Sequence, residues 1–126
     1  MMLSIQSLTK TYPNGVKALD EITLDIRPGM FGLLGPNGAG KSSLMRTIAT
    51  LQRPDKGNLS FNGIDIGNDP ISLRKILGYL PQVFGVYPKE TAENLLDYFA
   101  ILKGLSSRKE RKAKVEEVLH LTNLLE

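Results

Sequence analysis

The feature that most constrains this chain is a glycine-rich run of eight residues, Gly35-Pro36-Asn37-Gly38-Ala39-Gly40-Lys41-Ser42. Its pattern of Gly, four residues, Gly, Lys and Ser is the P-loop pattern. Glycines let the backbone fold into a tight concave turn, in which successive N–H groups point inward and form a nest for an anion. A helix that begins at this nest adds its unpaired N–H groups and the positive end of its dipole. The run therefore predicts a phosphate-binding turn between a strand and a helix.

Three side chains at the end of this run are candidates for contacts with a phosphorylated ligand. Lys41 is placed to reach the β- and γ-phosphates, and the hydroxyl of Ser42 to hold Mg²⁺. Ser43 can add a further hydroxyl to the phosphate shell. The structural alternative is a glycine-rich turn with an exposed lysine. The setting favours the P-loop, because an apolar run precedes the motif and a helical pattern follows it.

The spacing of apolar residues predicts a chain with both strands and helices. We expect Met30–Leu34 to be a strand that is covered on both faces, and Asn62-Gly63 to be a two-residue hairpin turn. Thr91 and Ser107 are expected N-caps, and Gly104 is expected at a helix C-terminus. The further expected strands are 3–8, 22–26, the residues around Leu59 and Phe61, and 76–80, and the expected helices are 43–51, 91–102 and 107–121.

Composition indicates an ordinary globular domain. The chain has 126 residues, of which 41% are hydrophobic and 23% are charged, and it has no cysteine. A disulfide scaffold and a thiolate metal site are excluded. No apolar stretch approaches the ~20 residues that span a bilayer, so we expect no membrane crossing and no signal peptide. A basic run could bind nucleic acid, but we interpret it as a solvated helix face; its residues are Lys103, Arg108, Lys109, Arg111, Lys112 and Lys114.

Residues 35–43 resemble the Walker A motif of ATP-binding cassette (ABC) ATPases. Tyr12, which follows a predicted strand, resembles the family's aromatic residue that stacks on adenine. Gly78-Tyr79-Leu80-Pro81-Gln82 resembles the segment that ends in the Q-loop glutamine, and Asn62-Gly63 with Asp65 resembles the family's second hairpin. Residues 91–95 resemble the ATPase subunits of bacterial systems that export drugs, antibiotics and lantibiotics.

The resemblance implies an α/β fold, a partial P-loop NTPase of the ABC type. It would contain an antiparallel β subdomain, the P-loop strand and helix, and the start of a helical subdomain. Residues 1–126 would be the N-terminal part of one ATP-binding domain. Within it, residues 1–83 would form the β subdomain and P-loop core, and residues 84–126 the start of the helical subdomain.

ATP and Mg²⁺ are the cofactors that this resemblance implies. Lys41 and Gln82 would be catalytic, and Ser42 and Gln82 would hold Mg²⁺. The residues that would bind ATP are Tyr12, Gly35, Pro36, Asn37, Gly38, Ala39, Gly40, Lys41, Ser42 and Ser43.

Several motifs of the family are not found in these residues: the signature, the Walker B strand with its acidic pair, the D-loop and the switch histidine. His120 lies in the last helical pattern, and we expect it to be a partly exposed helix residue. We therefore expect the chain to bind nucleotide at most, and hydrolysis to belong to a full-length parent. The flanking strands of Met30–Leu34 would also be missing, so that its edges and apolar side chains are exposed.

The implied partners are a membrane-spanning transporter subunit, with Phe84 and Tyr87 as candidate contacts, and a second cassette that pairs head to tail. The protein would then be cytoplasmic and peripheral on the cell membrane through its partner, and no nucleic-acid partner is expected. Two alternatives stay open. One is a soluble ABC-type ATPase that acts on ribosomes or nucleic acid, and the other is a truncated, non-catalytic chain that binds nucleotide.

Overall fold

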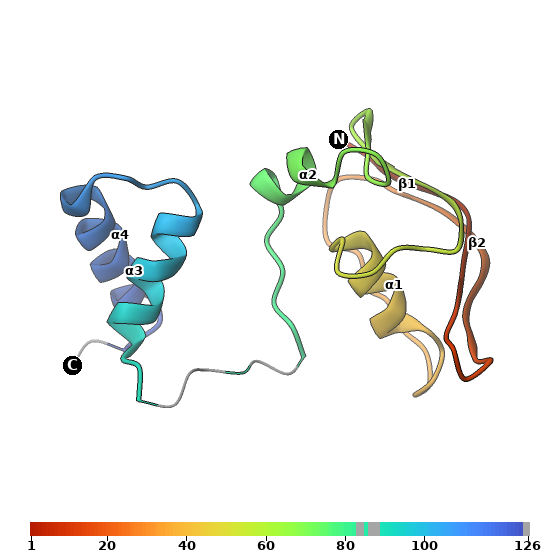
Figure 1. The fold of residues 1–126 in the computed structure, drawn as a ribbon, viewed down its shortest axis with the longest axis horizontal. Coiled ribbons are helices and arrows are strands. Elements are labelled where there is room, and N and C mark those ends of the chain that lie inside the picture. Colours follow the sequence, from red (N-terminus) through yellow and green to blue (C-terminus); the bar gives the residue numbers. More distant parts are fainter. Residues whose placement is uncertain (83–84, 86–88, 125–126) are drawn as a thin grey trace. The chain divides into compact units, whose positions relative to one another are not determined.

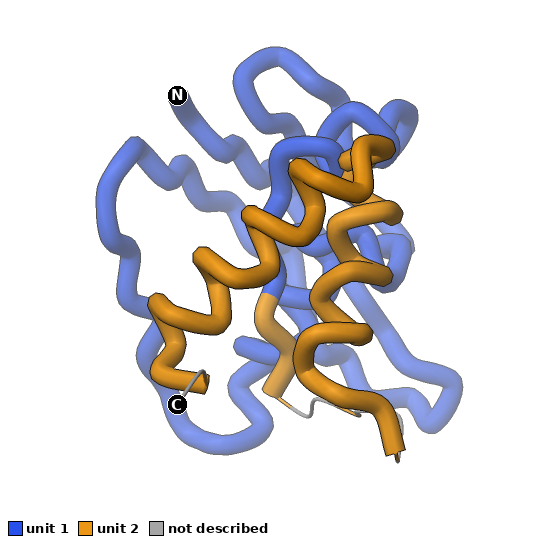
Figure 2. The backbone as a smooth tube through the Cα atoms, turned by 90° about the vertical axis from the view of Figure 1, so that its left-hand side faces the viewer, with its two compact units in different colours: residues 1–79 blue, residues 80–126 orange. Residues whose placement is uncertain are grey.

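The computed structural model describes residues 1–82, 85 and 89–124. Figure 2 shows that the chain divides into two compact units, residues 1–79 and residues 80–126. The first unit contains the glycine-rich motif, and the second is helical. The assignment of these units to a β subdomain with the P-loop core and to a helical subdomain stays a prediction.

The first unit is built on a four-stranded sheet in which all neighbours are antiparallel. Figure 1 labels two of these strands, β1 and β2, which pair with each other. The strand order is β2-β1-β3-β4. The core combines side chains from the sheet and from the helices of this unit: Ile5, Leu8, Leu19, Leu44, Leu59, Ile66 and Leu73. The strands are β1 (Leu3–Thr11), β2 (Lys17–Ile26), β3 (Lys56–Phe61) and β4 (Ile64–Asp65).

Strand β2 follows the predicted alternation over residues 22–26, but it begins five residues earlier, at Lys17. Ile22, Leu24 and Ile26 are half-buried, and the residues between them are exposed. Glu21 has a φ of 49°, which interrupts the alternation in the middle of the strand. The prediction of a strand over 22–26 is confirmed, and the interruption explains why the first half of β2 was missed.

The predicted hairpin between β3 and β4 is confirmed. Phe61 pairs with Ile64, so that only two residues form the turn. Asn62 and Gly63 have φ values of 48° and 83°. Positive values at both central positions are those of a type I′ turn, which favours Asn-Gly.

Two helices belong to the first unit. The predicted helix over 43–51 is confirmed in part: helix α1 (Lys41–Ile48) begins at the motif and contributes buried Leu44 to the core, but it ends before Leu51, which is 56% exposed. Helix α2 (Pro70–Ile76) was not predicted. Its signal is Asp69 followed by Pro70, because the Asp69 side chain accepts a hydrogen bond from the Ser72 N–H and proline fits the first helical position.

Two predicted strands are wrong. Residues 30–34 have no regular structure, and Met30 and Leu34 are 104% and 93% exposed. A strand needs a hydrogen-bonded neighbour, and no strand in the described ranges pairs with this run. Ile76 is the last residue of α2, and residues 77–81 are irregular.

The second unit contains two contacting helices, α3 (Ala92–Leu102) and α4 (Arg108–Leu121). The predicted caps are confirmed: Thr91 accepts a hydrogen bond from the N–H of Asn94, and Ser107 from that of Glu110. Gly104 follows α3 with a φ of 91°. None of the helices in the described part of the chain is long and apolar enough to cross a membrane.

The last helix differs from its prediction at one apolar position. Val115 and Leu119 are buried on α4, as expected. Leu121 was expected on the same face but is 77% exposed. It is the last helical residue, where the helix ends. His120 is an exposed helix residue.

Candidate functional site

The turn that precedes α1 requires glycine at its last position. Gly40 has φ 81° and ψ 1° and stands immediately before the helix. A Cβ atom at Gly40 would lie 2.2 Å from the carbonyl oxygen of Ala18 in β2. The turn therefore approaches the sheet backbone more closely than any side chain permits.

The Lys41 ammonium group lies inside this turn. Its Nζ donates hydrogen bonds to the carbonyl oxygens of Gly35, at 2.5 Å, and Pro36, at 2.6 Å. These two bonds close the turn across its opening. A phosphorylated ligand would offer the same ammonium group stronger, charged acceptors.

The N-terminus of α1 is free of side-chain caps. Gly40 provides no cap, and the first turn contains no acidic residue. Ser42 is exposed and Ser43 is half-buried at the second and third helical positions. The first N–H groups and the positive end of the helix dipole are therefore left for an anion. The remaining motif residues, Pro36, Asn37, Gly38 and Ala39, are exposed.

Tyr12 is brought to the first turn of α1. It directly follows β1 and is half-buried. Its hydroxyl lies 3.0 Å from Ser43 Oγ and donates a hydrogen bond of 3.1 Å to Gln52 Oε1. The structure thus joins Tyr12 to the motif, although the two are far apart in sequence. Gln52 was not predicted, because a single glutamine after a helix carries no pattern.

The end of β1 beside Tyr12 is held by Asp55. Its Oδ1 accepts a hydrogen bond of 2.8 Å from Lys10 Nζ, and its Oδ2 accepts one of 2.6 Å from the Thr11 N–H. These bonds hold the pKa of Asp55 below its ordinary 3.8, with the bond from Lys10 as the largest cause. Thr11, which precedes Tyr12 in the chain, is therefore held in place by the Asp55 carboxylate.

The remaining predicted residues belong to the sequence of the second unit. Gln82 belongs to the second unit and is exposed, and its role at Mg²⁺ stays a prediction. Phe84 and Tyr87 lie outside the described residues. Within the described ranges there is no group of three histidine, cysteine or acidic side chains that could hold a metal ion.

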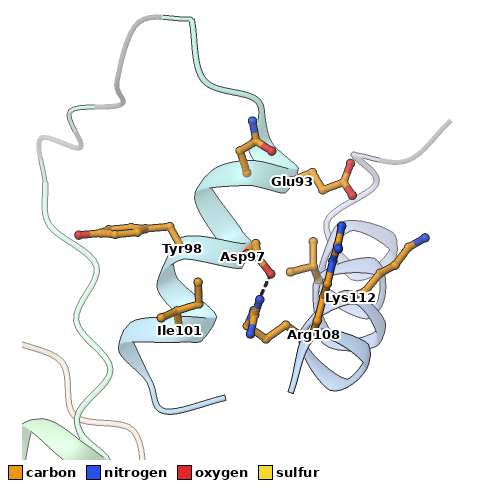
Figure 3. Close-up of a pocket in the computed structure, with 9 residues that line it drawn as sticks. Glu93, Asp97, Tyr98, Ile101, Arg108 and Lys112 are labelled. Atoms are coloured by element: carbon orange, nitrogen blue, oxygen red, sulfur yellow. Dashed lines mark hydrogen bonds and ion pairs between the residues drawn. The ribbon is translucent and has the colours of Figure 1, made fainter. Parts of the chain in front are cut away.

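A pocket lies in the helical unit. Figure 3 shows this pocket, of about 500 Å³, between α3 and α4. Asp97 on α3 accepts a hydrogen bond of 2.8 Å from Arg111 Nε on α4. Arg111 also donates to the carbonyl oxygens of Leu105 and Ser106 in the connecting turn. Through these bonds Arg111 connects α4 to α3 and to the turn between them. We call this arrangement the Arg111 clamp.

Comparison with known proteins identifies the family. The family model described as "ABC transporter" matches residues 19–126. The carnitine transport ATP-binding protein OpuCA of Listeria monocytogenes serotype 1/2a is 38% identical over 128 residues, which cover 99% of this chain and 32% of that protein. The doxorubicin resistance ATP-binding protein DrrA of Mycobacterium tuberculosis is 36% identical over 92% of this chain and 36% of that protein.

A solved structure supports the same conclusion. The ATP-binding cassette MJ0796, a dimer in a post-hydrolysis state bound to ADP and Pi, matches with a TM-score of 0.81 at 30% identity. The match covers 96% of this chain and 57% of that one. The fold is therefore part of a P-loop NTPase domain of the ABC type. The chain belongs to the ABC transporter family, and it spans 32% of OpuCA and 57% of the MJ0796 chain.

Proposed function

We propose that this chain binds Mg²⁺-ATP through its P-loop, as the nucleotide-binding part of an ABC transporter subunit. The observation that carries the proposal is the uncapped start of α1, with the Lys41 ammonium group held in the turn before it. Backbone N–H groups, a helix dipole and a lysine in one place are the usual components of a phosphate site.

Different residues of the site would contact different parts of the nucleotide. The N–H groups of residues 35–43 would bind phosphate oxygens, and Lys41 would exchange the Gly35 and Pro36 carbonyls for the β- and γ-phosphates. Tyr12 would stack on adenine through its ring. The exposed hydroxyl of Ser42 fits Mg²⁺, a hard cation that takes oxygen ligands, and Gln82 would supply a further oxygen. Mg²⁺ would neutralise phosphate charge when bound.

Hydrolysis would belong to the whole protein. Phosphoryl transfer needs a group that orients the attacking water, besides the cradle, the lysine and Mg²⁺. The sequence motifs that provide it in this family are not found in residues 1–126. We expect nucleotide binding without useful turnover from these residues alone.

The proposed partners follow from the relatives. Their names describe ATP-binding proteins for carnitine transport, sulfate/thiosulfate import and doxorubicin resistance. We therefore propose that the protein acts at the cytoplasmic face of a membrane, bound to a membrane-spanning partner. A second cassette is a further proposed partner, because MJ0796 is dimeric. Export is proposed from the likeness of residues 91–95 to the ATPase subunits of export systems. Other relatives are named for sulfate/thiosulfate and phosphonate import, so transport assays of the whole transporter decide the direction.

The basic run gives little support to the nucleic-acid alternative. Arg111 pairs with Asp97, and Lys114 lies 2.7 Å from Glu117. Lys112 lies 3.9 Å from Glu116. Acidic neighbours thus accompany three of the basic side chains; Lys112 and Lys114 are exposed on α4, and Arg111 is largely buried.

Isothermal titration calorimetry with Mg²⁺-ATP tests the proposal. The expected result is saturable binding to the chain, which Lys41→Ala weakens at least about tenfold, because a charged hydrogen bond to phosphate is lost. Lys109→Ala is the matched control, because it removes an exposed lysine on α4. Equal binding by Lys41→Ala and Lys109→Ala would contradict the proposal.

A further inference from the structure

Gln52 connects Tyr12 to the first turns of α1. Its Nε2 donates hydrogen bonds of 2.9 Å to the Ser43 carbonyl oxygen and to Thr47 Oγ1. Its Oε1 accepts the Tyr12 hydroxyl proton at 3.1 Å. Thr47 is only 2% exposed, so one end of the amide is anchored in the interior.

The orientation of this amide is set by its neighbours. The Ser43 carbonyl oxygen can only accept, so the NH₂ group must face it. The amide oxygen then faces Tyr12, whose hydroxyl has a single proton and donates it there. Ser43 must therefore donate its own proton to Tyr12, across 3.0 Å.

Every hydroxyl and amide proton of the network formed by Tyr12, Ser43, Thr47 and Gln52 is already used in a hydrogen bond. Thr47 gives its hydroxyl proton to the Ser43 carbonyl oxygen at 2.8 Å. Ser43 is the only member beside the phosphate cradle, and its proton is already used by Tyr12. A phosphate oxygen that accepts from Ser43 would take this proton away from Tyr12. The bond from Tyr12 to Gln52 would then remain as the tether of the tyrosine.

We propose that Gln52 is a positioning residue that holds Tyr12 at the base of the nucleotide when Ser43 turns its hydroxyl to a phosphate. This inference rests on the proposed function, because it assumes that Tyr12 contacts the base. Gln52 does not touch the ligand: it acts through Tyr12. Its effect is confined to ligands that carry a base, and triphosphate binding alone does not need it.

The experiment compares two ligands that share the phosphate chain. Mg²⁺-ATP and Mg²⁺-tripolyphosphate are titrated calorimetrically into the full chain and into Gln52→Leu, Tyr12→Phe and the double variant. Each single change should weaken ATP binding roughly two- to tenfold, the loss of one hydrogen bond. Tripolyphosphate binding should not weaken, because the tether acts only through the base. The double variant should lose no more than either single one, because both changes remove the same bond.

Matched controls separate this effect from general damage. Gln6→Leu changes an exposed glutamine on β1, and Tyr98→Phe changes a tyrosine that is 51% exposed on α3. Gln52→Glu keeps an oxygen for Tyr12 but loses the donors to Ser43 and Thr47. Circular dichroism melts show whether each variant folds. The two controls, Gln6→Leu and Tyr98→Phe, should bind ATP as the unchanged chain does.

The outcomes are distinct. Weaker ATP binding without weaker tripolyphosphate binding in Gln52→Leu and Tyr12→Phe supports the inference. Equal losses for both ligands, or no loss for either, overturn it and leave the proposed function standing. An unchanged chain that binds neither ligand overturns the proposed function and this inference together.

Discussion

At Gly40 the backbone has a φ of 81°, and the space for a Cβ atom is occupied by the Ala18 carbonyl oxygen. We expect Gly40→Ala to lower the free energy of unfolding by at least about 2 kcal/mol, since left-handed strain and the clash add together. Gly15→Ala is the matched control, because Gly15 has a φ of 82° and open space. It should lose only about 1 kcal/mol. Equal losses in urea melts would contradict the close approach.

A second prediction at this scale concerns the pH dependence of stability. The pKa of Asp55 is lowered in the folded chain, so its carboxylate stabilises the fold above the ordinary value of 3.8. This contribution is lost as the pH falls from 3.8 through the lower folded pKa. Asp55→Asn should therefore melt at a lower temperature at pH 7, and the difference from the unchanged chain should shrink in acid.

Thermal melts at several pH values check this result. Asp20→Asn is the control, because it removes an exposed carboxylate 3.1 Å from Lys17. Exposed pairs contribute little to stability, so this variant should melt as the unchanged chain does. A difference for Asp55→Asn that stays constant between pH 7 and pH 2 would argue against the anchor beside Tyr12.

Individual residues were predictable where a motif fixes their spacing. The P-loop residues were proposed from their motif and Tyr12 from the family resemblance, and the structure brings Tyr12 to Ser43. Their roles in binding ATP stay predictions. Gln52 and Asp55 were not found. Both act through hydrogen bonds across the fold, to Tyr12 and Thr11, and such contacts leave no local pattern.

At the scale of elements, most signals between neighbouring residues were predictive, although Asp69-Pro70 at the start of α2 was missed, and the predictions that depend on distant partners failed. The caps of α3 and α4 and the Asn62-Gly63 turn were predicted, because they depend on neighbouring residues alone. Residues 30–34 have the composition of a buried strand, but strand formation depends on a partner elsewhere in the fold. The apolar run after Ile76 misled in the same way.

The helical hairpin offers a prediction about its clamp. Arg111 has a side chain only 14% exposed and bonds to Asp97 and to the turn between α3 and α4. Arg111→Met should lower the free energy of α4 opening by about 1–2 kcal/mol, because charged hydrogen bonds are lost. Hydrogen exchange of α4 amides measures this opening. Arg108→Met, at the exposed start of the same helix, should leave exchange unchanged, and equal effects would contradict the clamp.

At the scale of the whole molecule, exposed apolar surface is the main property to test. Met30, Phe31 and Leu34 are 104%, 50% and 93% exposed, as expected for a run without strand partners. Unpaired apolar segments promote association between chains. We expect Leu34→Lys to reduce self-association in light scattering, and more than Leu121→Lys, a control at a position 77% exposed on α4. A monodisperse unchanged chain would contradict this prediction.

The central claim is that the turn around Lys41 binds the phosphates of Mg²⁺-ATP, and a thermal shift assay tests it most directly. Ligand at 100 times its dissociation constant stabilises a folded chain by about 2.7 kcal/mol. We predict that Mg²⁺-ATP raises the melting temperature, that Lys41→Ala abolishes the rise and that Lys109→Ala preserves it. No rise with the unchanged chain, or an equal rise with Lys41→Ala, would contradict the claim.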